Sequence, residues 1–224
     1  MPDTKISLMT AATSVAANDV VPIVQGGVNK RVDMQTLRTY MAGVNANDIG
    51  TPGAAGFGVG ICPSLPDGFS PLPGSTDPLS NNYGNYQYSD GSVMVWIPAY
   101  YLRIGHPSNP TYATYGVNSI AIEPLSAYQT EAKANADGFY LHRAFINAGA
   151  NQPGFFRDKY DCSLNGNIAS SIQGAMPMVS SPSAGQVGFS GATANGQTPL
   201  NNYSGAIPAA RSRGAKFVPE TVFM

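Results

Sequence analysis

The sequence predicts an α+β protein in which a small N-terminal hairpin-plus-helix unit precedes a larger, loop-rich domain of short antiparallel strands. Charged residues make up only 11% of the 224 residues, whereas an ordinary soluble domain has roughly 25%. Hydrophobic residues still account for 43%, including 12 Tyr and 9 Phe, which is enough to build a core. The apolar runs are short and are separated by turn-forming residues, as in proteins with many short strands.

Residues 1–45 form the first unit. Residues 20–24 and 28–32 read as two strands joined by a tight turn at Gln25-Gly26-Gly27. Asp33 is a good N-cap for a helix over residues 34–42. Such a unit has too little core to stand alone, so we expect an adaptor that folds against a partner or against copies of itself. The alternative is a terminal subdomain packed on its own chain.

A Gly/Ala-rich linker is predicted over residues 46–60, and residues 61–224 form the second domain. Its first part, residues 61–92, reads as a long loop carrying Tyr83, Tyr86 and Tyr88. Tyrosines among Asn, Ser and Gly are typical of adaptable recognition loops. The interpretation that the sequence favours is that they hold the loop against the protein surface.

The densest run of β-branched and aromatic residues follows the loop. Residues 93–97 and 99–104 read as two strands separated by Pro98, because proline cannot donate a ladder hydrogen bond and belongs at a strand boundary or bulge. This corner is expected to nucleate the core. Met94, Trp96 and Tyr101 are predicted to pack inside it.

The remaining elements are expected in the order strand, helix, strand, strand. The helix over residues 127–136 takes Ser126 as its N-cap, with Gln129 completing a capping box. The three strands are expected at residues 117–122, 139–146 and 155–162. Residues 163–210 read as an unusually long loop. Residues 216–224 read as a strand end followed by a helix start at Pro219, so we expect a continuation beyond Met224.

No catalytic, nucleotide or metal-spaced motif is present in the sequence, so no enzyme activity, cofactor or metal is predicted. Cys62 and Cys162 are either two buried thiols or a disulfide between two loops. His106 and His142 each lack a nearby second ligand and are interpreted as structural. A simple cross-strand pair would explain Asp158.

Neither nucleic acid nor a membrane is an expected partner. The net charge near −1 provides no basic surface for nucleic acid or anionic lipid. No apolar run approaches the roughly 20 residues of a membrane helix. The N-terminus lacks the features of a signal peptide, which predicts synthesis in the cytoplasm.

The N-terminal run KISLMTAATSVAANDVVPIVQGGVNKRVDMQTLRTYM resembles the head-proximal segment of many tailed-phage fibre and other virion proteins. That pattern, KIS-L-x-A-A followed by D-x-x-P-V-V-Q-G-G and then V and L, covers about a sixth of this chain. The resemblance implies a segment that anchors a fibre or appendage to the particle. The implied anchoring residues are Ile6, Leu8, Val21, Ile23, Val24, Gln25 and Leu37.

A second resemblance begins at the proline corner. MVWIPAYYLRIG, GFFRDKYDCS and KFVPETVFM are similar, in this order, to segments of the formylglycine-generating-enzyme/C-type-lectin-like fold. Ala99 and Tyr100 replace the family's usual glycines, and Cys162 stands where the family has Val. The reactive cysteines of that family lie in its C-terminal half and match neither Cys62 nor Cys162, so no catalytic residue is implied.

Together the resemblances imply a structural virion component of a tailed phage, made in the host cytoplasm and located in the particle. Its partners would be other virion proteins, copies of itself in a homo-oligomer, and a host surface glycan or protein. One alternative is a non-viral carbohydrate-binding lectin, which the absence of a signal peptide disfavours. The remote alternative is a sulfatase-maturation-type oxidase, which would need a copper-binding cysteine pair.

Overall fold

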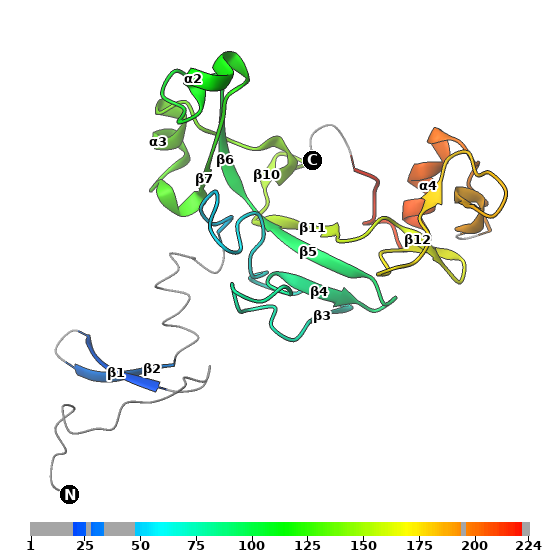
Figure 1. Cartoon of the computed structure of the whole chain (residues 1–224), viewed down its shortest axis with the longest axis horizontal. Helices are drawn as coiled ribbons and strands as arrows, with labels where there is room; N and C mark the ends of the chain where they lie inside the picture. Colours follow the sequence, from blue (N-terminus) through cyan, green and yellow to red (C-terminus); the bar gives the residue numbers. More distant parts are fainter. Residues whose placement is uncertain (1–19, 26–27, 34–47, 194–195, 221–224) are drawn as a thin grey trace, which may run out of the picture.

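The computed structural model describes residues 20–25, 28–33, 48–193 and 196–220, and we describe its N-terminal hairpin by itself (Figure 1). Strand β1 (Val20–Gln25) pairs antiparallel with β2 (Val28–Asp33). The register pairs Val21 with Val32 and Gln25 with Val28, so two residues join the strands. The hairpin prediction is confirmed, with each strand one residue longer than expected. The helix expected over 34–42 lies outside the described residues.

A four-stranded antiparallel sheet lies at the centre of the remaining structure. The strand order is β11-β5-β4-β3. The bounds are β3 Phe69–Pro71, β4 Asn85–Tyr88, β5 Val93–Pro98 and β11 Gly154–Asp158. In β5 the side chains alternate, and the buried set includes Met94 and Trp96, as predicted. The alternation follows from the two-residue period of a strand.

Aromatic rings fill one side of this sheet. Phe156 stacks on Phe69 with ring centroids 4.1 Å apart, and it meets the edges of Tyr86 and Trp96 at 5.4 and 5.0 Å. Cys62 packs against the same cluster. Offset and edge-to-face pairs of this kind stabilise a core beyond the area that they bury.

At Ala99 the chain leaves the central sheet and enters a second one. Strand β6 (Tyr100–Ile104) is the middle strand of a three-stranded sheet, between β7 (Ile120–Pro124) and β8 (Tyr140–Leu141). The proline corner predicted from the sequence is therefore the point where one continuous extended segment passes between two sheets (Figure 1).

Short helices lie in the connections around the strands of the second sheet. They are α2 (Tyr112–Tyr115) and α3 (Glu131–Ala136), with 3-10 turns at Gly116–Asn118, Leu125–Ala127 and Arg143–Phe145. Tyr101, Ala134 and Phe139 form the buried cluster between α3 and the sheet. Tyr101 is thus a core residue, as predicted.

The chain returns to the central sheet through a small hairpin, β9 (Ile146–Asn147) and β10 (Ala150–Asn151). Strand β11 then runs antiparallel to β5, with Gly154 opposite Pro98 and Asp158 opposite Met94. The end of β11 therefore lies beside the start of β5. This end of the sheet leads into the C-terminal lobe (Figure 1).

The C-terminal lobe consists of small ladders and one short helix. Strands β12 (Ser163–Asn165) and β13 (Ile168–Ser170) are antiparallel, and β14 (Met178–Val179) and β15 (Val187–Gly188) are parallel. The 3-10 turns Phe189–Gly191 and Tyr203–Gly205 precede helix α4 (Ala206–Arg211). The buried core of the C-terminal lobe consists of Ala169, Met178, Ala192 and Ala209.

The fold is α+β and loop-rich, as predicted, but several elements differ from the expectation. Helix α3 begins after Thr130, whose side chain accepts the Lys133 N–H at 3.2 Å, and not after Ser126. Ser126 instead donates its hydroxyl to the Asp48 carboxylate. Only two residues of the strand expected at 139–146 pair with β6. The strands β3 and β4, the ladders from residue 163 onward and helix α4 all fall where the sequence predicts loop.

The expected linker also differs over residues 48–60. Asp48 and Ile49 are buried, and the Gly58 N–H donates to the Ile49 carbonyl at 2.9 Å. The Gly60 N–H donates to the Trp96 carbonyl at 3.1 Å, which ties this segment to β5. These residues belong to the folded body because their backbone groups are paired with it.

Candidate ligand-binding site

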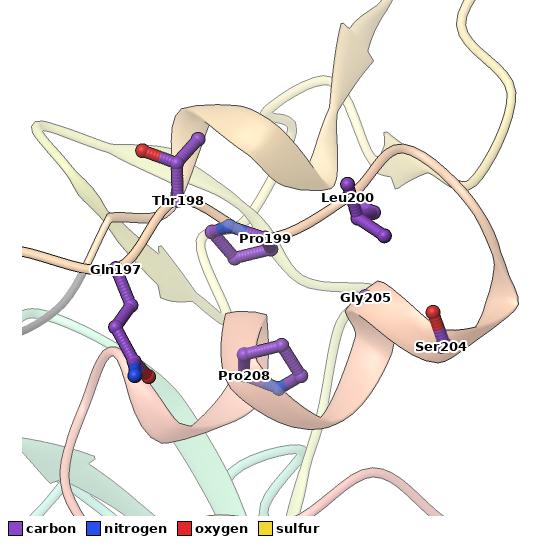
Figure 2. Close-up of a pocket in the computed structure, with 7 residues that line it drawn as sticks. All are labelled: Gln197, Thr198, Pro199, Leu200, Ser204, Gly205 and Pro208. Carbon is purple, nitrogen blue, oxygen red and sulfur yellow. The ribbon is translucent and has the colours of Figure 1, made fainter.

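The described part of the chain includes two open pockets of different character. The proline pocket, of about 450 Å³, is formed by the C-terminal lobe. Figure 2 shows Pro199 opposite Pro208, with Gln197 at one end and Ser204 at the other. None of the described residues that line it is charged. It offers few groups that would orient a ligand.

The polar pocket, of about 360 Å³, lies beside the second sheet. It is lined by Arg103, His106, Ser108, Asn135, Ala136, Asp137 and Gly138. Arg103 comes from β6, His106 and Ser108 from the loop after β6, and the other residues from the end of α3. Pockets with a few convergent polar groups are the default candidates for binding sites.

Arg103 is held rigidly at this pocket. Its Nε donates to Asn109 Oδ1 at 2.7 Å, Nη1 donates to the Asp137 carbonyl at 3.0 Å, and Nη2 donates to the Ser108 carbonyl at 3.2 Å. The guanidinium carbon also lies 4.2 Å from the centre of the Phe139 ring. A guanidinium has five N–H groups, so these three bonds leave two for another acceptor.

The loop after β6 is built around Asn109. Its buried side-chain amide donates to the carbonyls of Arg103 and Ser119 at 3.1 and 3.2 Å. His106 Nδ1 accepts the Ser108 N–H at 3.1 Å. Because Nδ1 is the acceptor, the neutral ring carries its proton on Nε2, which is left as a donor. One ring nitrogen of His106 thus has a partner within its own loop.

The end of α3 supplies the other wall. Lys133 Nζ bonds both Asp137 carboxylate oxygens, at 2.7 and 2.6 Å, and so neutralises this acid. Asn135 Oδ1 is shielded from solvent and accepts no hydrogen bond from any described residue. Such a buried acceptor costs stability and calls for an explanation.

Gly138 ends α3 with a positive φ of 80° and keeps the pocket open. A Cβ at this position would lie 3.3 Å from Arg103 Cδ and 3.6 Å from His106 Cδ2. A side chain at this position would therefore fill the space between Arg103 and His106. Glycine is also the residue that adopts this backbone conformation without strain.

A second polar centre, the Arg213 cluster, consists of Arg213, Asp90 and Asp158. The Arg213 side chain is 2% exposed. Its Nε donates to Asp90 Oδ2 at 2.9 Å, and Nη1 donates to both Asp158 oxygens at 2.8 and 2.9 Å. Phe217 covers the guanidinium at 4.1 Å. With these partners the guanidinium is shielded from ligands, so we interpret this cluster as structural.

The acids of the cluster have further partners. Burial alone would raise the pKa of Asp90, but hydrogen bonds from Ser92 and Ser170 together with the charge of Arg213 lower it below the ordinary value.

Cys162 Sγ donates to Asp158 Oδ2 at 3.0 Å. Burial, and then the negative charge of Asp158, raise the pKa of the Cys162 thiol to about 12. The simple cross-strand pair predicted for Asp158 is therefore wrong, because its neighbour on β5 is Met94 and its charged partner, Arg213, follows helix α4 and lies in no strand.

Both cysteines are free thiols, so the disulfide alternative is excluded. Cys62 belongs to the aromatic cluster of the central sheet, and Cys162 packs against the core of the C-terminal lobe. In the other predicted structural histidine, His142, Nδ1 accepts the Ala144 N–H at 3.3 Å. Burial lowers the pKa of His142.

The three tyrosines of the expected recognition loop do not form a common surface. Tyr83 and Tyr86 are buried, and Tyr86 Oη accepts the Cys62 N–H at 2.8 Å. Burial raises the pKa of Tyr83 to about 12. Tyr88 is half-buried between Phe69 and Phe217. These contacts correspond to the alternative in which the tyrosines hold the segment in place.

The predicted anchoring residues fall in two groups. Val21, Ile23, Val24 and Gln25 belong to β1. Ile6, Leu8 and Leu37 lie outside the described residues. The sequence does not predict Arg103 and Arg213 as organising residues, because their partners are separated from them by up to 34 and 123 residues. No local spacing signals contacts of this length.

Compared with known proteins, the chain matches no family model, no curated protein sequence and no solved structure.

In the part of the chain that the structure describes, α3 and α4 are the longest helices at six residues each, and no helix could span a membrane.

Proposed function

We propose that this chain is a structural component of a tailed-phage virion. It would be attached to the particle through residues 1–45 and would present the body that follows, either to a host receptor or to neighbouring virion proteins. The observation that carries the proposal is the N-terminal pattern, whose D-x-x-P-V-V-Q-G-G core corresponds to residues 19–27 of this chain and includes β1. A short hairpin of this kind gains stability when it adds to a larger assembly.

The lectin-like part of the proposal has separate support. The segments that resemble the formylglycine-generating-enzyme/C-type-lectin-like fold include β5 and β11, which are neighbours in one sheet. The described residues of the body also form long connections and only short helices. These features agree with a lectin-like domain, which we propose as the fold of residues 61–224.

A carbohydrate-binding lectin outside a virus is the second candidate, and the polar pocket favours it. We do not propose an oxidase of the sulfatase-maturation type. That chemistry would need a cysteine pair, whereas the two thiols of this chain pack in separate clusters.

Copies of the chain are proposed to assemble with one another, because virion appendages are symmetric and the N-terminal unit is small. Multi-angle light scattering of the full chain at micromolar concentration tests this point. We expect the mass of a homo-oligomer, and a monomer would contradict self-assembly.

Incorporation into particles tests the attachment. In a phage carrying this chain, Val21→Asp places a charge at a predicted anchoring position that pairs with Val32. We expect the variant to be lost from purified particles, while its thermal unfolding stays close to that of the unmodified chain. Arg31→Gln, at an exposed position of the same hairpin, is the matched control and should be incorporated normally. Equal incorporation of all three chains would overturn attachment through the hairpin.

A further inference from the structure

We propose that the polar pocket binds a carboxylate-bearing sugar residue. This inference rests on the proposed receptor-binding role and gives it a site and a ligand class. The pocket is not among the positions that the sequence predicted for recognition, which were the three tyrosines.

Arg103 provides the group that would bind the carboxylate. Its position is fixed by three hydrogen bonds and by the Phe139 ring, so little ordering is needed when a ligand arrives. Its two remaining N–H groups suit carboxylate oxygens, since guanidinium–carboxylate hydrogen bonds are strong and directional. The pairing of Asp137 with Lys133 offsets part of the repulsion that this acid would exert on a bound carboxylate.

Neutral groups beside Arg103 suit the hydroxyls of a sugar. His106 Nε2–H is left as a donor once Nδ1 has accepted the Ser108 N–H. The Ser108 hydroxyl can donate or accept. The Asn135 side chain carries an unpartnered oxygen, and rotation of its amide would present either a donor or an acceptor to the pocket. These residues all line the same pocket.

The size of the pocket agrees with a single sugar ring. Its volume of about 360 Å³ is near the lower end for small-molecule sites. A simple inorganic anion would use Arg103 but leave the hydroxyl-binding groups unsatisfied. The proline pocket has no charged group among its described lining residues, so it does not share this chemistry.

Binding of three probes to the full chain tests the proposal by calorimetry or by NMR titration. Glucuronic acid carries a carboxylate and hydroxyls, glucose carries hydroxyls alone, and acetate carries a carboxylate alone. We expect glucuronic acid to bind with a Kd on the order of 1 mM, and each of the other probes to bind at least about tenfold more weakly. Glucose or acetate binding as tightly as glucuronic acid would overturn the proposal, as would no binding of any probe.

A matched pair of variants locates the site. His106→Asn keeps an oxygen that can accept the Ser108 N–H but removes the distal donor. His106→Gln keeps an amide donor near that position. We expect glucuronic acid to bind about five- to tenfold more weakly to His106→Asn, and within about twofold of the unmodified chain to His106→Gln. Gln197→Ala, in the proline pocket, should have no effect.

Unchanged binding in both His106 variants, or loss only in Gln197→Ala, would place the binding elsewhere and overturn the assignment. Equal loss in both His106 variants would overturn the role given to the distal donor. The sugar titration is independent of particle incorporation. A chain that is incorporated but binds no acidic sugar contradicts only this inference, whereas one that binds the sugar but is never found in particles contradicts the virion proposal.

Discussion

At the scale of single residues, Tyr86 acts through both its hydroxyl and its ring inside the protein. Tyr86 is 2% exposed, and its hydroxyl accepts the Cys62 N–H at 2.8 Å while its ring packs on Phe156. This bond joins the start of the body to β4. The hydrogen bond therefore joins two residues that are 24 positions apart and holds the start of the body against the sheet.

Replacing Tyr86 with Phe tests this role. The buried Cys62 N–H would lose its acceptor, so we expect the free energy of unfolding to fall by about 1–3 kcal/mol. Urea denaturation followed by tryptophan fluorescence measures the change. Tyr203→Phe, at a residue that is 91% exposed, serves as the control and should stay within about 0.5 kcal/mol. Unchanged stability in Tyr86→Phe would mean that the bond contributes nothing.

At the scale of elements, the Arg213 cluster joins three parts of the chain. Arg213 follows α4, Asp90 lies in the turn between β4 and β5, and Asp158 ends β11. Asn165 adds a further link by donating to the Asp90 carbonyl at 2.8 Å. The C-terminal lobe is therefore attached to the central sheet through buried charges.

Removing the guanidinium should weaken this attachment strongly. Arg213→Met leaves two carboxylates without their buried cation, and we expect a loss of about 3–5 kcal/mol in the free energy of unfolding. Arg157→Met is the matched control, because its pair with Glu220 is exposed on both sides and should contribute less than about 1 kcal/mol. Equal effects in the two variants would contradict a special role for the buried cluster.

The lowered pKa of Asp90 predicts a dependence of stability on pH. A carboxyl whose pKa is lower in the folded state stabilises the protein fully above its ordinary pKa, and this contribution is lost as the pH falls through the folded-state value. Between about pH 5 and pH 3, the urea midpoint should therefore fall more steeply in the unmodified chain than in Asp90→Asn. Parallel curves in this range would show that Asp90 is not the group responsible.

At the scale of the whole molecule, the sequence predicted the parts that depend on local pattern. The hairpin follows from two apolar runs around Gly26-Gly27, and the β5–β6 corner follows from Pro98 between two β-rich runs. The ladders of the C-terminal lobe were missed because their strands have only two or three residues. Strands this short have too few positions to show an alternating pattern.

The candidate site could not have been found from the sequence in the same way. The polar pocket forms where β6 meets the end of α3, and Arg103 reaches the Asp137 carbonyl 34 residues along the chain. The predicted N-cap at Ser126 would have started the helix earlier, whereas Thr130 sets the actual start. Tertiary contacts, including the bond from Ser126 to Asp48, decided between these two capping patterns.

Quantitative mass spectrometry of purified particles tests the central claim most directly. In a phage that carries this chain, particles purified through a density gradient should contain it at several copies each, and its amount should follow the major capsid protein across the gradient. A chain that stays in the soluble fraction of the lysate and is not detected in the particle peak would contradict a structural role in the virion.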